Sequence, residues 1–280
     1  MAQAENAKKL DYTPVTYDDQ YILMVNQLKK YFPIKGGLMS QTVGHVKAVD
    51  GVTFNLKRGH TMGLVGESGC GKSTIAGILA AKNRGYTGRI TLGGVPLSEV
   101  AETDLMKHVV LVRHNSYLFK GTVEENLRMA EPDATKEEME AVLQKVNLLG
   151  FLQTQNGLQT ELLEKAGNLS GGQCQRLVIA RALLRSDSAV YIFDEAASNI
   201  DVESEELIMN VIHELAKTKT VLLISHRLAN VVQSDQIYFL KNGTICERGT
   251  HAELMEQNGA YRHLYDSQMV LENYGKEGNA

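Results

Sequence analysis

The sequence predicts an α/β protein built around a mainly parallel β-sheet, and three observations support this fold class. Short apolar segments typical of buried strands, such as Val190–Phe193 and Val221–Ser225, alternate with segments of helical character. A glycine-rich loop joins the apolar segment Thr61–Val65 to a helix. The middle of the chain, Thr122–Leu149, becomes helical, which indicates an inserted helical subdomain.

The first hundred residues predict mostly strands. Residues 1–20 are polar and contain no apolar h-region, so we expect a flexible leader and no signal peptide. Strand patterns begin at Tyr21–Val25 and continue over His45–Leu56, where apolar and polar residues alternate. A further strand is expected at Arg89–Leu92, after the first helix.

Helix starts in the rest of the chain are marked by capping boxes, in which Ser or Thr precedes Glu or Gln by three residues. One helix is expected to run to Leu184, and another to begin near Val202. Asn242-Gly243 between two strand-like segments predicts a hairpin. The capping boxes are Thr122/Glu125, Thr135/Glu138, Ser170/Gln173 and Thr250/Glu253.

Composition narrows the function classes. The chain has 280 residues, 43% of them hydrophobic, and a net charge of −4, which argues against a general nucleic-acid binder. Three cysteines in no metal-binding spacing argue against a disulfide framework or a zinc site. No stretch approaches the ~18 consecutive apolar residues of a membrane helix. We therefore expect a cytoplasmic chain that could dock on a membrane protein.

The glycine-rich loop predicts a phosphate site. It fits the pattern G-x-x-x-x-G-K-[ST] between a strand and a helix, where glycines let backbone N–H groups converge on phosphate oxygens. Lys72 can reach the β- and γ-phosphates, and the Ser73 hydroxyl suits Mg²⁺. The alternative is a glycine-rich turn with an incidental lysine. The loop residues are Gly66, Glu67, Ser68, Gly69, Cys70, Gly71, Lys72, Ser73 and Thr74.

Two further segments fit phosphate chemistry. Ser170-Gly171-Gly172-Gln173 opens a helix, where it could bind an anion or form only a capping box. The strand at 190–193 runs into Asp194-Glu195, which suits a metal-linked carboxylate followed by a residue that orients water. The alternative for this pair is a helix cap or a surface pair. His226 follows the strand at 221–225, a strand-end position suited to contact a γ-phosphate.

These residues resemble the nucleotide-binding domains of ABC transporters over about residues 21–265. GESGCGKST resembles the Walker A motif, LSGGQ the family signature and VYIFDE the Walker B motif. Ser198-Asn199-Ile200-Asp201 resembles the D-loop, and Ser225-His226-Arg227 resembles the switch-histidine motif.

The resemblance implies a P-loop NTPase (RecA-like) core, an antiparallel β subdomain and an inserted α-helical subdomain at about 114–168. It implies ATP and Mg²⁺ as cofactors, with each ATP held between the P-loop of one chain and Ser170-Gly171-Gly172 of a second. Glu195 would be the base or water-positioning residue, and His226 would contact the γ-phosphate. Asp201 would communicate across the dimer interface. The partner would be the same chain or a sister subunit, docked on separate transmembrane permease subunits at the inner face of the cell membrane.

Four positions need separate interpretation. Tyr31 resembles the aromatic residue that stacks on adenine, or it is a core tyrosine at a strand edge. His114 stands where the family has a glutamine that ligates Mg²⁺; a neutral histidine can bind a metal, but Mg²⁺ prefers oxygen ligands. Cys174 replaces the basic residue usual after LSGGQ, and Asn199 stands where alanine is commoner.

The two parts of the chain resemble different branches of the family. Up to about residue 75, KKYFPIKGG and TVGHVKAVDGVTF resemble ATPase subunits of oligopeptide/dipeptide importers. Beyond it, YLFKGTVEENL and FDEAASNIDVESEE resemble exporter ATPase domains. We expect a leader at 1–20, an ABC ATPase domain at 21–265 and a tail at 266–280. The expected function is ATP-driven transport, and the importer-like first part suggests oligopeptides or dipeptides as the cargo. The alternatives are a non-transport ABC ATPase and a non-hydrolysing or recombinant nucleotide-binding module.

Overall fold

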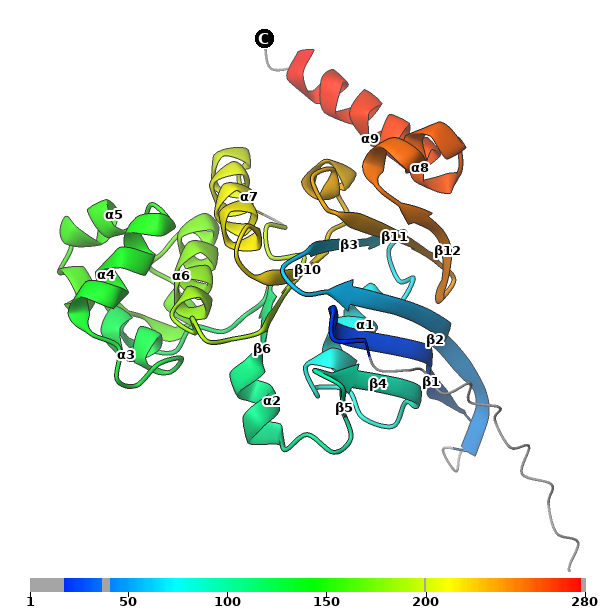
Figure 1. Ribbon diagram of the computed structural model, residues 1–280. Helices are drawn as coiled ribbons and strands as arrows, with labels where there is room; N and C mark the ends of the chain where they lie inside the picture. Colours follow the sequence, from blue (N-terminus) through cyan, green and yellow to red (C-terminus); the bar gives the residue numbers. More distant parts are fainter. Residues whose placement is uncertain (1–17, 37–40, 199, 278–280) are drawn as a thin grey trace, which may run out of the picture.

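The computed structural model describes residues 18–36, 41–198 and 200–277, with side chains up to residue 271. Most of the predicted leader and Asn199 of the predicted D-loop therefore lie outside the described residues. Figure 1 shows an antiparallel sheet, a larger mainly parallel sheet and a group of helices beside the larger sheet. The α/β fold with an antiparallel β region and a helical insertion is confirmed.

The antiparallel sheet has the strand order β2-β1-β4-β5. The strand segments expected at 21–25 and 45–56 are parts of two longer strands, which pair from Tyr21↔Lys57 to Gly36↔Gln41. The short strand β5 pairs with β4 at the edge. The bounds are β1 Tyr21–Gly36, β2 Gln41–Lys57, β4 Thr87–Leu92 and β5 Val95–Pro96.

The main sheet has the order β12-β11-β3-β10-β9-β6. Five neighbouring strands, β6, β9, β10, β3 and β11, are parallel to one another. The hairpin predicted at Asn242-Gly243 adds β12, which runs antiparallel to β11 at the edge of the sheet. Both turn residues adopt positive φ, 50° and 78°, as a tight hairpin of this kind requires. The bounds are β3 Thr61–Gly66, β6 Val109–Arg113, β9 Val190–Asp194, β10 Thr220–Ile224, β11 Gln236–Lys241 and β12 Thr244–Gly249.

Both faces of the main sheet are buried at its three central strands, β3, β10 and β9, which explains why these strands are mostly apolar. Along β9, Tyr191 and Phe193 pack into a core with the helical subdomain, while Val190 and Ile192 pack into a second core with the antiparallel sheet and α1. This alternation follows from the two-residue period of a strand. The sheet therefore forms a rigid middle layer, and its strand ends are fixed from both sides.

The helices that the sequence marks with capping boxes begin where they were predicted. All four predicted capping boxes are present, with both of their reciprocal hydrogen bonds. The helical segment expected at 122–149 is divided into three short helices, which lie beside α6 at the left of Figure 1. These helices are α3 Val123–Arg128, α4 Lys136–Lys145, α5 Leu149–Gln153 and α6 Gly171–Leu183. Short elements flank them: β7 Gly121–Thr122, η1 Gly157–Gln159, β8 Glu161–Leu162 and η2 Glu164–Ala166.

The remaining helices complete the fold: α1 Lys72–Leu79, α2 Glu102–His108, α7 Val202–Ala216, η3 Leu228–Val231, α8 His251–Gln257 and α9 Ala260–Glu277. The domain boundary predicted at residue 265 falls inside α9, so no break in secondary structure marks it; the division into leader, domain and tail remains a prediction. Within the part of the chain that the structure describes, no helix has the combined length and hydrophobicity needed to cross a bilayer.

Candidate functional site

The carboxyl ends of four neighbouring parallel strands meet at one edge of the main sheet. The strand β3 ends at Gly66, β10 is followed by Ser225 and His226, β9 ends at Asp194, and β6 ends at Arg113. This edge is the usual binding position in open α/β sheets. It brings together the glycine-rich loop, the Asp-Glu pair and the strand-end histidine, which are far apart in the sequence.

Glycines shape the loop between β3 and α1. Gly66 has φ 143°, and a Cβ there would lie 2.0 Å from the carbonyl oxygen of Leu240. Gly71 has φ 106°, and a Cβ there would lie 2.1 Å from the carbonyl oxygen of Ala48. Gly69, at φ 78°, faces open space within 4 Å. The loop is thus held by backbone contacts that only glycine allows, and one side of it remains open to a ligand.

Lys72 is almost completely buried, at 4% exposure. Its ammonium group donates hydrogen bonds to the carbonyl oxygens of Gly66, at 2.8 Å, and Glu67, at 3.0 Å, and lies 3.5 Å from the Sγ of Cys70. The N-cap of α1 is Gly71, which has no side chain to accept a bond from the first N–H groups of the helix. A loop with a buried cation and an uncapped helix start fits an anion such as phosphate.

Asp194, the last residue of β9, contacts the start of the helix that follows this loop. Its Oδ1 accepts a hydrogen bond from the Ser73 hydroxyl at 2.8 Å, and its Oδ2 lies 3.2 Å from the Nε of Arg113. Burial raises the pKa of Asp194, while the bond from Ser73, the charge of Arg113 and the charge of His114 lower it. The Ser73 and Asp194 oxygens are hard donors at adjacent positions, which fits Mg²⁺ completed by phosphate oxygens and water.

Glu195 and His226 line one small pocket beside Asp194. Glu195 has the left-handed φ of 53°, and its N–H donates to the carbonyl oxygen of Ile224 at 2.9 Å, which ties β9 to β10 at their ends. The Nδ1 of His226 lies 3.5 Å from the Ser198 hydroxyl. The left-handed backbone of Glu195 is thus held at the ends of two neighbouring strands, beside the pocket that His226 also lines.

The loop after β10 is held by the C-terminal helix. The amide nitrogen of Gln268 in α9 donates to the carbonyl oxygen of His226 at 2.6 Å, and its amide oxygen accepts from the N–H of Leu228 at 2.9 Å. Sequence reasoning missed Gln268, because the contact joins residues 42 positions apart and no motif marks it. Arg113 was also missed, although its position at a strand end, directly before His114, was a usable signal.

His114 is exposed on the loop that follows β6. Its charge contributes to the pKa of Asp194, so it lies within electrostatic range of that carboxylate. No group of three or more His, Cys, Asp and Glu side chains suited to a metal is found among the described residues. Its role as a metal ligand remains a prediction.

Tyr31 lies on β1, directly opposite Lys47 of β2. The next residue of β2, Ala48, places its carbonyl oxygen close to Gly71 of the glycine-rich loop. Its hydroxyl donates to Asp50, and the Lys47 ammonium lies 5.5 Å from its ring centroid. The Tyr31 side chain is partly exposed, so it is not a core tyrosine, and its role in stacking on a base remains a prediction.

The segment predicted as the signature lies at the start of α6. Ser170 caps this helix, and its N–H donates to the side chain of Gln173 at 2.9 Å. A Cβ on Gly172 would lie 2.1 Å from the hydroxyl of Ser204 in α7, whose N-cap is Asp201. Within the described residues no hydrogen bond joins residues 170–173 to residues 66–74. The glycine-rich loop at 66–74 and the segment at 170–173, the two predicted phosphate sites, therefore lie in separate parts of the domain and do not form one site within this chain.

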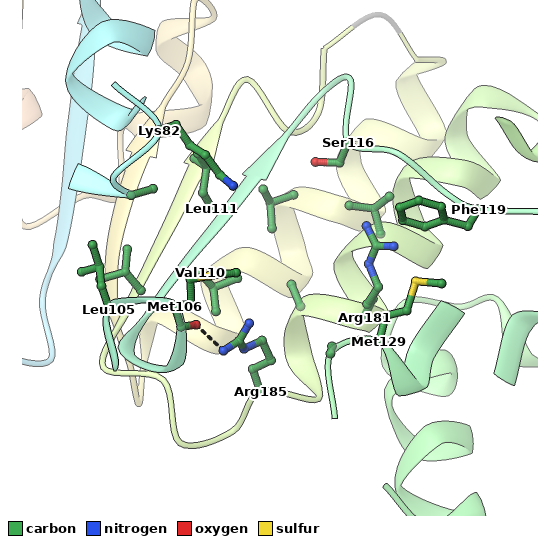
Figure 2. A pocket seen from close by; sticks show the side chains of 16 residues that line it. Lys82, Leu105, Met106, Val110, Leu111, Ser116, Phe119, Met129, Arg181 and Arg185 are labelled. Carbon is green, nitrogen blue, oxygen red and sulfur yellow. Dashed lines mark hydrogen bonds between the residues drawn. The ribbon is translucent and has the colours of Figure 1, made fainter. Parts of the chain in front are cut away.

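A groove lies between the main sheet and the helical subdomain (Figure 2). It has a volume of about 490 Å³ and carries three exposed apolar side chains, Met106, Phe119 and Met129. Arg181 and Arg185 border it, held by the carbonyl oxygens of Tyr117 and Met106, respectively. The groove thus combines apolar side chains with basic side chains at its border.

The loop, the strand-end carboxylates and the fold together define a P-loop nucleotide-binding domain. A family model described as ABC transporter matches residues 49–198. The chain belongs to the ABC transporter family, and it contains the ATPase domain of that family.

Relatives support this assignment. The chain is 46% identical over 233 residues to an uncharacterized ABC transporter ATP-binding protein of Haemophilus influenzae, covering 83% of this chain and 41% of that protein. It is 42% identical to an ATP-dependent lipid A-core flippase of Vibrio vulnificus, over 78% of this chain and 38% of that protein. A solved structure of a bacterial Atm1-family ABC exporter with ATP bound matches with a TM-score of 0.78 and 28% identity, over 95% of this chain and 44% of that one. The chain spans about two fifths of the length of these curated relatives. None of these three is named as a peptide importer, so they do not support the predicted uptake of peptides.

Proposed function

We propose that this chain binds and hydrolyses ATP and that it energises transport through transmembrane segments. The observation that carries this proposal is the meeting of four strand ends, which brings the glycine-rich loop, Asp194-Glu195 and His226 to one edge of the main sheet. A nucleotide-binding site, a water-positioning group and a γ-phosphate contact then lie together.

The chain would bind the phosphates of ATP with the backbone of Gly66–Thr74. The Lys72 ammonium, which now bonds to two loop carbonyls, would exchange them for β- and γ-phosphate oxygens. Ser73 and Asp194 would hold Mg²⁺, and His114 is a third candidate ligand. Mg²⁺, when bound, neutralises charge on the phosphates. Tyr31 would stack on the base from the side of the antiparallel sheet.

Glu195 would orient the attacking water, and His226 would contact the γ-phosphate. The positive φ of Glu195 and the two hydrogen bonds between Gln268 and the loop of His226 support these positions. Both side chains would then act from a frame that is rigid before ATP binds, so little reorganisation is required during hydrolysis.

A second ATPase domain would complete each site. The residues Ser170, Gly171, Gly172 and Gln173 make no hydrogen bond to the chain's own glycine-rich loop, and they start a helix suited to phosphate. We therefore propose a dimer, of this chain with itself or with a sister subunit, in which these residues close over the ATP of the partner. Asp201, next to Gly172, would communicate between the two sites.

The transmembrane partner would dock in the groove of Figure 2. Its apolar floor and its bordering arginines fit a short amphipathic helix with acidic residues. We propose a separate permease as this partner and a position on the inner face of the cell membrane. Export is favoured by the likeness to a lipid flippase and to an exporter; peptide uptake rests only on the segment before residue 75.

The decisive experiment uses the Glu195→Gln variant, which should bind ATP but not hydrolyse it. Its mass in solution is measured by light scattering with and without Mg²⁺ and ATP, and its ATPase rate is compared with that of the parent. A shift from monomer to dimer with ATP, together with a rate loss of about 10²-fold or more, is expected. Hydrolysis at the parent rate would refute the role of Glu195.

Two other outcomes would favour the alternatives. A chain that binds ATP and neither dimerises nor hydrolyses would be a non-hydrolysing nucleotide-binding module. An active dimer that binds no transmembrane protein in its native membrane would be a non-transport ABC ATPase.

A further inference from the structure

Arg113 is a feature of the site that none of the proposed roles uses. It ends β6 and lies directly opposite Asp194, the last residue of β9, in the parallel register. Its Nε lies 3.2 Å from one carboxylate oxygen of Asp194, while the other oxygen accepts the hydrogen bond from Ser73. Both oxygens of the candidate metal ligand are thus engaged by groups of the same chain.

The position of Arg113 is fixed by its surroundings. Its guanidinium extends over α1 at Gly77, where a Cβ would lie 3.2 Å from an Nη atom of the arginine. Its backbone carbonyl accepts a hydrogen bond from the Gln175 amide of α6 at 3.2 Å. The ion pair therefore links the end of the sheet with α1 and α6, and it does not depend on a freely moving surface side chain.

Burial strengthens the electrostatic interaction between Arg113 and Asp194. The Asp194 side chain is 5% exposed and that of Arg113 33% exposed, so solvent and salt screen their interaction less than in a surface pair. A buried carboxylate needs a compensating charge. In a chain without bound metal, Arg113 supplies that charge.

A divalent cation held by Ser73 and Asp194 would compete with this guanidinium. It would either displace the Nε of Arg113 from Asp194 or bind next to a fixed positive charge, and both weaken its binding. Building on the proposed ATP site, we propose that Arg113 is the resident counter-ion of Asp194 and sets the Mg²⁺ concentration at which the site binds Mg²⁺ with ATP. Its removal leaves Asp194 unpaired, which strengthens Mg²⁺ binding and weakens ATP binding in the absence of the metal.

The test measures binding and not turnover. The full-length chain is titrated with MgCl₂ in the presence of a fluorescent ATP analogue, and the half-saturating Mg²⁺ concentration is determined for the parent, Arg113→Gln and Arg113→Lys. Affinity for the analogue is also measured in excess EDTA. Arg84→Gln is the matched control, because it removes an arginine paired with Glu102 at 2.7 Å on an exposed surface away from the site.

We expect the half-saturating Mg²⁺ concentration to fall about five- to fiftyfold in Arg113→Gln. Arg113→Lys, which keeps a positive charge beside Asp194, and Arg84→Gln should both stay within about twofold of the parent. Affinity in EDTA should fall in Arg113→Gln. Thermal unfolding of each variant checks that it is folded, and Arg113→Ser replaces Arg113→Gln if the latter is not.

An unchanged or raised half-saturating Mg²⁺ concentration would overturn the inference. So would an equal loss of affinity at every Mg²⁺ concentration, since that would indicate direct contact of Arg113 with the phosphates. A parent that binds no more analogue than Lys72→Ala would overturn the proposed function together with this inference. If the parent binds the ATP analogue more tightly than Lys72→Ala does, but Arg113→Gln has the same half-saturating Mg²⁺ concentration as the parent, the inference alone would be overturned.

Discussion

Gln268→Ala tests whether the C-terminal helix positions the predicted switch histidine. The Gln268 amide spans the loop after β10, with bonds of 2.6 Å to the carbonyl oxygen of His226 and 2.9 Å from the N–H of Leu228. Alanine removes both bonds and keeps the helix intact, because alanine is a strong helix former. The structure offers no other side chain that bonds to these two backbone groups among the described residues.

The expected size of the effect follows from these two bonds. Each hydrogen bond contributes about 0.5–1.5 kcal/mol, so the variant should lose roughly 1–3 kcal/mol, with the lower half more reasonable for a partly exposed site. This corresponds to a fall in the unfolding midpoint of several degrees. Without the two hydrogen bonds of Gln268, His226 should shift by up to about 1 Å. A shift of this size should lower kcat about ten- to a hundredfold.

The assay distinguishes a displacement of His226 from a general loss of folding stability. We expect kcat for ATP hydrolysis to fall at a temperature well below the unfolding midpoint, while the affinity for ATP changes less than about twofold. Ser267→Ala is the control, because among the described residues the Ser267 hydroxyl bonds only to the carbonyl oxygen of His263 within the same helix. A Gln268→Ala variant with the parent kcat and only a lowered unfolding midpoint would refute the positioning role.

Three further predictions concern the phosphate and metal groups. Lys72→Ala should weaken ATP binding by about thirtyfold or more, because a buried ammonium is lost from the phosphate loop; unchanged affinity in a nucleotide-binding titration would contradict the loop assignment. His114→Gln should keep or raise Mg²⁺-dependent turnover, since it restores an oxygen ligand; a large loss of kcat would show that the histidine has a task of its own. Gly172→Ala should cost about 1–3 kcal/mol in denaturant unfolding and impair ATP-dependent dimerisation, because its Cβ would lie 2.1 Å from the hydroxyl and 2.7 Å from the Cβ of Ser204. Gly172→Ala combined with Ser204→Gly should recover part of that stability, and no recovery would argue against this clash as the cause.

The sequence could predict whatever depends on neighbours in the chain. Four capping boxes and the Asn242-Gly243 hairpin were predictable because each is closed by hydrogen bonds between residues a few positions apart. The glycine-rich loop was predictable from its motif, because Gly66, Gly69 and Gly71 lie close together in the chain and all adopt positive φ. The carbonyl groups of Leu240 and Ala48 that pack against Gly66 and Gly71 come from distant segments and could not be predicted. The lengths of β1 and β2 were underestimated, because their outer halves contain polar residues and are held by pairing with each other.

The tertiary structure decided which distant residues meet. Strand order places Arg113 beside Asp194, and the packing of α9 places Gln268 on the loop of His226. The close approach of α6 and α7 makes glycine necessary at position 172. The sequence by itself determined the motifs and hence the class of chemistry. The groups that surround Asp194 and contact the loop of His226 depended on sheet register and helix packing, because those contacts join distant segments and follow no local pattern.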